Sequence, residues 1–226
     1  MRVLCVGDSL GLPREDCPYE ETWFYKLEEY FSSHTFIDYF IRGMIIRDAL
    51  NRYETYFQYY ASDIVIIQAG IVDCAPRYIQ EKKTSVKALL LVLKKLRLEN
   101  FFWRVIKRRG RKKDCVFTDF DTFYNTYDLL VSKLLSGGVK KIFLIKIGHA
   151  TDTVLLKNPF INNNVDKYNK AIEQICANHN DEVKALDPLF NVCEKDFVDG
   201  YHCSPIGMRK VFEELKNELL TYGLTR

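Results

Sequence analysis

The chain opens with a short apolar run, residues 3–6, that leads directly into Gly7-Asp8-Ser9-Leu10. Four consecutive apolar residues followed by a glycine are typical of a buried strand that ends in a sharp turn. The turn presents Ser9 just beyond the carboxyl end of the strand. In open α/β sheets this is the end at which ligands bind, so the first ten residues already suggest a site.

Four further strand-like runs follow, and helix-period patterns separate them. The strand-like runs are residues 36–41, 63–69, 141–147 and 183–186, and the helical patterns are residues 20–31, 85–98, 120–135, 165–178 and the segment after Ser204-Pro205. Alternation of this kind predicts an α/β fold, a three-layer α/β/α sandwich around a mostly parallel sheet of about five strands. A length of 226 residues suits a single domain over residues 1–226.

A serine at a strand end is a useful nucleophile only if a base takes its proton. Near the other end of the chain, Asp199 and His202 stand three residues apart in Asp199-Gly-Tyr-His202-Cys-Ser204-Pro205, directly before a predicted helix. A histidine held by an aspartate is the base that such a serine requires. The sequence therefore predicts a nucleophilic triad of Ser9, His202 and Asp199.

These two motifs together resemble the GDSL, or SGNH, hydrolase family. A third segment, Gly70-Ile-Val72-Asp73, is similar to the Gly-x-Asn-Asp block of that family. The resemblance implies a flavodoxin-like SGNH hydrolase fold over essentially the whole chain. It also implies ester chemistry through an acyl-enzyme, with Ser9 as the nucleophile.

The same resemblance indicates where an oxyanion hole would lie. In the family the donors are the amide of the nucleophile, a glycine amide after the second strand and the asparagine of Gly-x-Asn-Asp. Here the first is the amide of Ser9, and the second is the amide of Gly43 or, in another alignment, of Ile45 or Ile46. The asparagine position holds Val72, which has no side-chain donor. Loss of one donor typically costs on the order of 3 kcal/mol of transition-state stabilisation.

Four charged residues close to predicted strand ends are candidates for substrate binding: Asp8, Asp73, Arg77 and His149. Arg77 is a five-donor cation suited to a carboxylate or phosphate, although Asp73 could instead pair with it and hold the loop. Cys74 is a candidate second nucleophile, and a buried inert thiol is the alternative.

Several classes of site and location are not indicated. The histidines lack metal-ligand spacing and no phosphate-binding glycine loop appears, so we expect neither a metal nor a cofactor. The 7 cysteines are irregularly spaced and are expected to be reduced. The first strand begins almost at Met1, and no apolar run is long enough to span a membrane. These features favour a cytoplasmic location, with peripheral membrane contact as the alternative.

A basic insertion at about residues 99–118 interrupts the α/β pattern. From Arg104 to Lys113 it holds seven basic residues in ten, directly after Phe101, Phe102 and Trp103. Three interpretations remain open: a solvated loop, contact with an anionic membrane surface through the aromatic residues, or binding of an anionic polymer. Nucleic acid is the least favoured polymer, because no nucleic-acid-binding motif accompanies the segment.

The sequence thus predicts a serine-dependent ester hydrolase acting on a small polar or carbohydrate-linked ester, such as an acetylated glycan. A glycan O-acyltransferase using the same triad is one alternative. A catalytically impaired carbohydrate-binding module is the other, and Val72 favours it. If the triad is active, turnover rises as His202 loses its proton, and Asp199 is expected to move that midpoint above the usual ~6.5.

Overall fold

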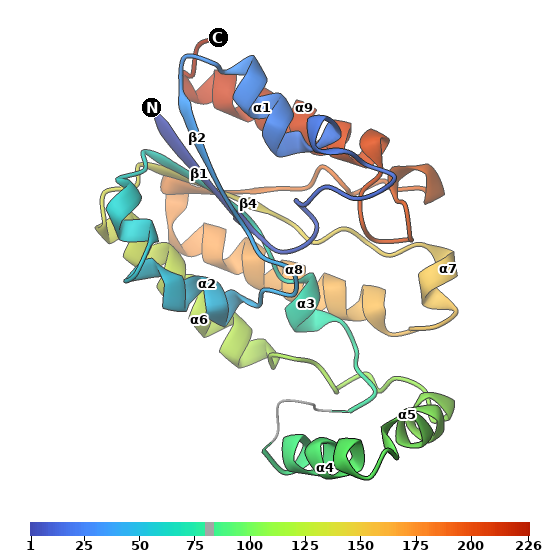
Figure 1. Cartoon of the computed structure of the whole chain (residues 1–226). Helices are drawn as coiled ribbons and strands as arrows, with labels where there is room; N and C mark the ends of the chain where they lie inside the picture. Colours follow the sequence, from blue (N-terminus) through green and yellow to red (C-terminus); the bar gives the residue numbers. More distant parts are fainter. Residues whose placement is uncertain (80–83) are drawn as a thin grey trace.

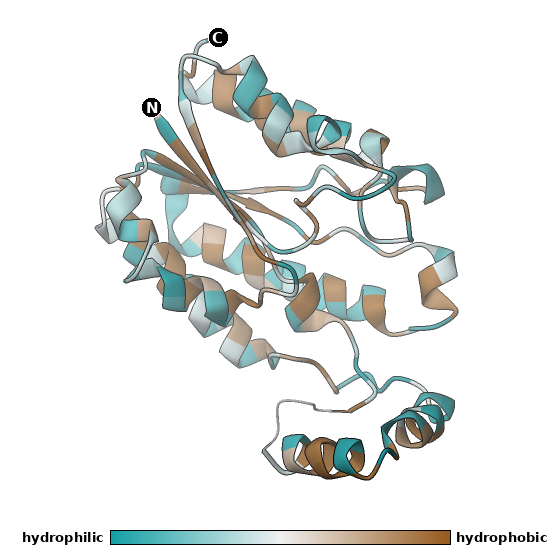
Figure 2. Cartoon of the chain, in the orientation of Figure 1, coloured by the Kyte–Doolittle hydropathy of each residue, from teal (hydrophilic) through white to brown (hydrophobic). Residues whose placement is uncertain are grey.

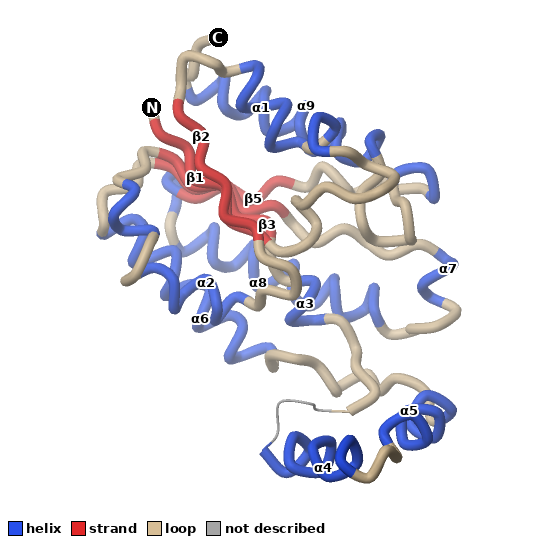
Figure 3. The backbone as a smooth tube through the Cα atoms, viewed as in Figure 1, coloured by secondary structure: helices blue, strands red, loops and turns tan. Residues whose placement is uncertain are grey.

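A computed structural model describes residues 1–79 and 84–226, and its centre is a five-stranded sheet (Figures 1 and 3). All neighbouring strands are parallel, in the order β2-β1-β3-β4-β5. The strands are β1 (Arg2–Gly7), β2 (Thr35–Phe40), β3 (Ile64–Gln68), β4 (Lys141–Ile145) and β5 (Val183–Leu186). The predicted sheet of five parallel strands is confirmed, and each strand lies within two residues of its expected bounds.

Helices cover both faces of this sheet, as the three-layer prediction requires (Figure 1). One face carries α1 (Trp23–Tyr30) and α9 (Pro205–Tyr222), and the other carries α2 (Ile46–Tyr53), α6 (Phe120–Ser136) and α8 (Ile161–Asn178). Two short helices, α3 (Ile71–Cys74) and α7 (Asp152–Leu155), follow β3 and β4. Short 3-10 turns occupy Tyr19–Glu21, Phe57–Tyr60, Asn180–Glu182 and Glu194–Asp196.

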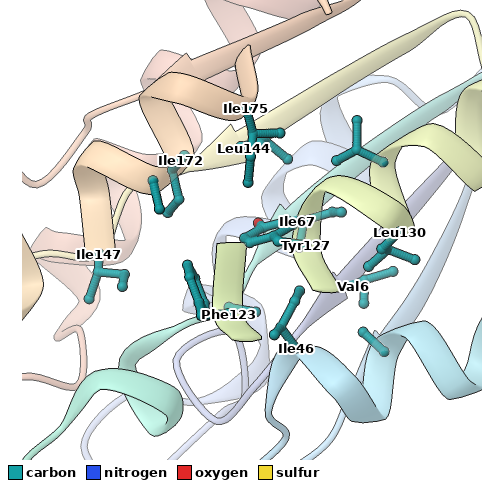
Figure 4. Close-up of a cluster of buried hydrophobic side chains, with 14 of the residues drawn as sticks. Val6, Ile46, Ile67, Phe123, Tyr127, Leu130, Leu144, Ile147, Ile172 and Ile175 are labelled. Carbon is teal, nitrogen blue, oxygen red and sulfur yellow. The ribbon is translucent and has the colours of Figure 1, made fainter. Parts of the chain in front are cut away.

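The central strands are apolar on both sides because both of their faces are covered. In β1, Val3 and Cys5 join the hydrophobic cluster beneath α1 and α9. Leu4 and Val6 point the other way, into the cluster under α2, α6 and α8. Figure 4 shows the second cluster, in which Phe123 and Tyr127 of α6 meet aliphatic side chains from the sheet and α8.

Local signals in the sequence fix the helix ends. Ser204 caps α9 by accepting hydrogen bonds from the amides of Ile206 and Gly207, and Pro205 occupies the first helical position. Helix α6 ends at Gly137-Gly138, where Gly138 has a φ of +98°. The predicted beginning of α9 and the predicted end of α6 are both confirmed.

Two helices leave this body and form a hairpin, α4 (Thr84–Lys95) and α5 (Glu99–Arg108). Figure 1 shows them next to each other, away from the sheet, and neither contains a buried residue. The expected helix at residues 85–98 therefore exists but does not cover the sheet. Its leucine pattern predicted an amphipathic helix correctly, yet periodicity alone does not identify what the apolar side chains contact. The hairpin extends the basic insertion expected at 99–118 toward the N-terminus.

Candidate functional site

Ser9 lies in the turn that follows β1, at the carboxyl edge of the sheet. Strand β1 sits between β2 and β3, and this is the point in a 2-1-3-4-5 sheet where the strand order reverses. The chain turns immediately after Gly7, whose missing side chain leaves room: a Cβ there would lie 2.8 Å from the Gln68 carbonyl oxygen. The sequence motif thus places Ser9 where an open α/β sheet forms its ligand crevice.

Ser9, His202 and Asp199 form a hydrogen-bonded series. Ser9 Oγ lies 3.1 Å from His202 Nε2, and His202 Nδ1 lies 2.7 Å from Asp199 Oδ2. The other carboxylate oxygen of Asp199 accepts a hydrogen bond from the backbone amide of His202 at 3.0 Å. The structure therefore brings these three residues together, although 190 residues separate Ser9 from Asp199 in the sequence.

A tight loop before α9 sets the orientation of the histidine. Gly200 has a φ of +93°, and a Cβ at this position would lie 2.5 Å from Val154 Cγ2. Its carbonyl accepts the amide of Thr151 at 2.9 Å, which ties the loop to the segment before α7. Only glycine fits this conformation and this close approach, so the Asp199-Gly200 turn is structurally required.

Burial and hydrogen bonding set the protonation of the pair. Burial lowers the pKa of His202 and outweighs the opposing effect of Asp199, so the pKa lies below the usual 6.5. Burial alone would raise the pKa of Asp199, but hydrogen bonds from His202 outweigh it, and this pKa lies below its ordinary value. The expected upward shift of the histidine is wrong, because the sequence did not reveal how deeply the ring is buried. A neutral imidazole beside a carboxylate at neutral pH can accept the serine proton.

A cavity of about 340 Å³ opens in front of Ser9 and His202. It is lined on one side by α3 and the chain after it and on the other by α7 and the Asp199–His202 loop. Val72 and Arg77, both singled out in the sequence, lie on its wall, together with Arg111 of the basic insertion and Tyr201 of the Asp199–His202 motif. Lys157 also lines it, and motif spacing gave no signal for this residue, because only the fold brings its segment to the cavity.

The structure argues against one of the second-strand candidates for the oxyanion hole. Ile46 is fully buried and its amide donates to Asp73 Oδ2 at 3.1 Å, so Ile46 is not available as an oxyanion donor and that expectation is wrong. Gly43 is exposed, with a φ of +72°. Within the described residues, the amides of Gly43 and Ser9 donate to no backbone or side-chain acceptor. Gly43 does not line the cavity in front of Ser9.

Asp8 and Asp73 lie behind the cavity and not in it. Both are fully buried, which corrects their assignment to substrate binding. Asp73 accepts hydrogen bonds from the Ile46 amide and from Thr118 Oγ1 at 2.5 Å, and so holds two loops. Asp8 Oδ1 accepts from the Leu10 amide at 2.8 Å, and burial raises the pKa of Asp8 to about 7.

Two further candidates lie away from the cavity. His149 Nε2 lies 2.6 Å from Asp166 Oδ1, and both residues line a separate cavity of about 290 Å³ beyond β4. Because β4 ends at Ile145, the chain has already left the Ser9 crevice when it reaches His149. Cys74 is fully buried and burial raises its pKa far above that of a free thiol, as in the inert alternative. All seven cysteines lie in the described residues and are free thiols.

The two ends of the helical hairpin meet beside the cavity. The Arg77 amide donates to the Cys115 carbonyl at 2.6 Å, and the Lys112 amide donates to the Arg77 carbonyl at 3.2 Å. Asn164 of α8 donates to the carbonyls of Cys74 and Lys113. These bonds anchor the base of the hairpin and carry Arg111 to the cavity wall.

Some classes of site are absent from the described residues. Over residues 1–79 and 84–226, no group of three or more His, Cys, Asp or Glu side chains is arranged to hold a metal ion. In the same residues, no helix is both long enough and apolar enough to cross a membrane.

By sequence the chain matches no family model, and no curated protein is recognisably similar to it. Its fold, however, matches solved structures along its whole length. A lipase/acylhydrolase from Enterococcus faecalis superposes with a TM-score of 0.69 at 13% identity, over 100% of this chain and 98% of that one. A lipolytic protein of the G-D-S-L family from Desulfitobacterium hafniense, described as putative, gives 0.64 at 14% identity, over 96% and 98%.

A third neighbour is a catalytic mutant of Axe2, an acetylxylan esterase from Geobacillus stearothermophilus. It superposes with a TM-score of 0.65 at 16% identity, over 99% of this chain and 94% of that one. The chain therefore has the fold of SGNH/GDSL lipases, acylhydrolases and esterases, and the fold that the sequence motifs implied is confirmed.

Proposed function

We propose that this protein is a serine-dependent ester hydrolase in which Ser9, His202 and Asp199 form the catalytic triad. The observation that carries the proposal is the continuous series of hydrogen bonds from Ser9 Oγ through the imidazole to the Asp199 carboxylate. It stands at the opening of a cavity large enough for a small ester. The pKa of His202 and the pKa of Asp199 both lie below their ordinary values, which favours a neutral imidazole beside a carboxylate at neutral pH.

The reaction follows from the positions of these atoms. His202 Nε2 takes the proton of Ser9 Oγ while the oxygen attacks the ester carbonyl, and a tetrahedral oxyanion forms. Collapse of this intermediate expels the alcohol, which receives the proton from His202, and leaves an acyl-serine. Water then repeats the sequence with the same proton transfers and releases the acid. Asp199 keeps the ring oriented and stabilises the imidazolium in both halves.

The backbone amide of Ser9 is the proposed donor to the oxyanion. The amide of Ser9 has no acceptor within the described residues, and neither has the amide of Gly43. Val72, on the cavity wall, offers no side-chain donor where the family has asparagine. We therefore assign the oxyanion to the amide of Ser9, which lines the cavity, and not to that of Gly43, which does not, with weaker stabilisation than three donors would give.

The proposed substrate is a small polar or carbohydrate-linked ester, with removal of an acetyl group from a glycan as one example. The acetylxylan esterase among the structural neighbours supports this class. The cavity supports it too, because charged side chains contribute to its wall and three of them are cations. Transfer of the acyl group to a sugar hydroxyl, in place of water, would use the same triad.

The alternative from another class is a carbohydrate-binding module with an impaired site, which Val72 favours. A panel of esters that differ in acyl length and alcohol, assayed with the wild type and with Ser9→Ala, distinguishes the two. Turnover that Ser9→Ala abolishes supports the hydrolase. Equal hydrolysis in both proteins, or none on any ester, contradicts it. Adding a sugar acceptor and analysing the products separates hydrolysis from transfer.

A further inference from the structure

The cavity in front of Ser9 has an excess of positive charge. Three cations line it, Arg77, Arg111 and Lys157, and among the residues that the structure describes Asp199 is the only acidic one on its wall. The carboxylate of Asp199 is already engaged by the ring and the backbone of His202. A substrate in this cavity therefore meets cations on both sides, since Arg111 comes from the base of the hairpin and Lys157 from the chain just after α7.

Over residues 1–79 and 84–226, neither Arg111 nor Lys157 makes an ion pair with a carboxylate. The Arg111 guanidinium lies over the ring of Tyr78, 5.1 Å from its centroid. Its Nε is buried and has no hydrogen-bond partner in the same part of the chain. A planar cation supported by an aromatic ring presents its remaining donors in a fixed direction, which suits recognition of a carboxylate or phosphate.

The positive surface continues beyond the serine. A second cavity, of about 310 Å³, shares Arg77 and Arg111 with the first and adds Tyr78, Trp103 and Lys107. Trp103 and Lys107 belong to α5, so the hairpin supplies part of this wall. A ligand whose ester lies at Ser9 can therefore extend along a continuous path of cations and aromatic rings.

We propose that the ester substrate carries an anionic group, a carboxylate or a phosphate, which binds Arg111 and Lys157 beside Arg77. This inference rests on the proposed function and specifies its substrate class. A charge-assisted hydrogen bond to such a group in a partly enclosed cavity contributes more than one to a neutral acceptor. It also gives Arg111 and Lys157 a role as specificity residues.

The test compares acetates of three matched alcohols: 3-hydroxybenzoate, 3-hydroxyphenyl phosphate and the neutral 3-hydroxybenzamide. We expect kcat/KM for the two anionic esters to exceed that for the amide at least tenfold, mainly through KM, and the preference to weaken with salt. In Arg111→Gln and Lys157→Gln the preference falls toward equality. Lys112 is the neighbour of Arg111 in the sequence but does not line the cavity. Lys112→Gln therefore removes the same charge and should keep the preference for anionic esters.

Equal kcat/KM for anionic and neutral esters, with turnover that still requires Ser9, overturns the anionic substrate and leaves the hydrolase intact. A binding measurement covers the case in which no ester turns over. Calorimetry with Ser9→Ala protein and phenyl phosphate is expected to detect binding that Arg111→Gln weakens tenfold. Absence of binding there, or binding that Arg111→Gln leaves unchanged, also overturns the proposal.

A different observation concerns the outer surface of the hairpin. Six large apolar side chains are between 46% and 69% exposed: Leu89, Leu91, Val92, Leu96, Leu98 and Phe101. Figure 2 shows the apolar stretch along α4. No part of the chain that the structure describes buries these side chains. Exposed apolar patches on a folded protein usually mark an interaction surface.

The charge of the hairpin indicates what kind of partner this apolar surface binds. Residues 84–113 contain eleven basic side chains and one acidic side chain, Glu99. Exposed leucines and an aromatic residue combined with many lysines and arginines are the pattern of helices that lie at an anionic membrane surface. We infer that the α4–α5 hairpin binds the surface of an anionic membrane, with its leucines at the level of the lipid headgroups.

Cosedimentation with vesicles tests this inference. The wild type is expected to bind vesicles of phosphatidylcholine and phosphatidylserine, and to bind pure phosphatidylcholine vesicles at least tenfold more weakly. Leu89→Gln/Leu96→Gln should reduce binding tenfold, whereas Leu129→Gln/Leu156→Gln, which changes two exposed leucines of the body, should not. Failure to bind either vesicle contradicts the inference. So does a concentration-dependent dimer that the hairpin variant abolishes, or tight binding to heparin that the leucine changes leave unaltered.

Discussion

The α/β body and the α4–α5 hairpin differ in the burial of their residues and in their charge. Every residue of β3 is buried, whereas α4 and α5 contain no buried residue at all. Outside residues 84–113 the chain has 22 basic and 29 acidic residues, so its positive charge is concentrated in the hairpin. Burial stabilises the body, whereas the hairpin is held mainly at its base, by backbone hydrogen bonds around Arg77 and Cys115.

The groups that perform the proposed reaction lie in the body, whereas the hairpin supplies groups that select the substrate. The proposed triad lies entirely in the body, on loops positioned by β1 and α9. The hairpin contributes charge and aromatic surface to the cavity wall but none of the reacting atoms. Substitutions in the body should therefore change turnover or stability. Substitutions at exposed positions of the hairpin should change neither turnover nor stability, and should alter the binding of substrate or membrane.

The largest contrast is expected between two aspartates. Asp199→Asn should lower kcat by roughly 10³- to 10⁴-fold, because an amide no longer holds His202 in the tautomer that accepts the serine proton. Asp114→Asn, an exposed position between the hairpin and α6, should leave kcat within about twofold. Steady-state kinetics on a short-chain aryl ester, with circular dichroism to verify the fold, would measure both. Near-wild-type kcat in Asp199→Asn would remove Asp199 from the triad.

Two leucines test the same contrast in stability. Leu144→Ala, in the fully buried centre of β4, should lower the free energy of unfolding by about 2–5 kcal/mol because it leaves a cavity between the sheet and its helices. Leu91→Ala, at a side chain that is 69% exposed, should change it by less than about 0.5 kcal/mol. Urea denaturation of the two variants gives the comparison. A similar loss in both would mean that the hairpin packs against the body.

Substitution of Val72 tests how the site stabilises the oxyanion without the asparagine donor that the family has at this position. Val72→Asn should leave kcat/KM unchanged or raise it by up to about tenfold, because the new amide can reach the oxyanion at the position where the family has asparagine. Arg77→Ala serves as the comparison, since Arg77 lines the same cavity. If Val72→Asn is harmful and Arg77→Ala severely damaging at unchanged thermal stability, Arg77 has taken the place of the asparagine.

The smallest effect is a displacement of the pH profile. Activity requires neutral His202, so kcat/KM should rise with pH through a single ionisation. Because burial lowers the pKa of His202, the midpoint should lie below 6.5, and the rise should be complete at neutral pH. Removing charge from the hairpin at Lys112 should leave the midpoint in place. A midpoint above 6.5 would indicate that Asp199 outweighs burial.

The sequence predicted the body well because local patterns determine it. Apolar runs bounded by turn residues located all five strands, and Ser204-Pro205 located the beginning of α9. The two motifs containing Ser9 and His202 became neighbours because parallel strands and short loops bring their ends to one edge. Conversely, Asp8 and Asp73 were expected to contact substrate, and only the packing around them reveals that they are buried.

The hairpin illustrates what local patterns leave undetermined. The leucine periodicity of α4 predicted a helix, but the same pattern serves a helix on a sheet and a helix on a hairpin. The place of Arg111 depends on hydrogen bonds between Arg77, Lys112 and Cys115, which no spacing encodes. Likewise, the amide of Ile46 was an acceptable oxyanion donor until its bond to Asp73 was seen.

The central claim is that Ser9 is a nucleophile activated by His202, and covalent labelling tests it most directly. The protein is treated with an alkyl organophosphonate, digested and analysed by mass spectrometry, with Ser9→Ala and Cys74→Ala treated in parallel. The account predicts a single adduct on Ser9 in the wild type and in Cys74→Ala, and none in Ser9→Ala. An adduct on Cys74, or no adduct under conditions that fully label a known serine esterase, would contradict it.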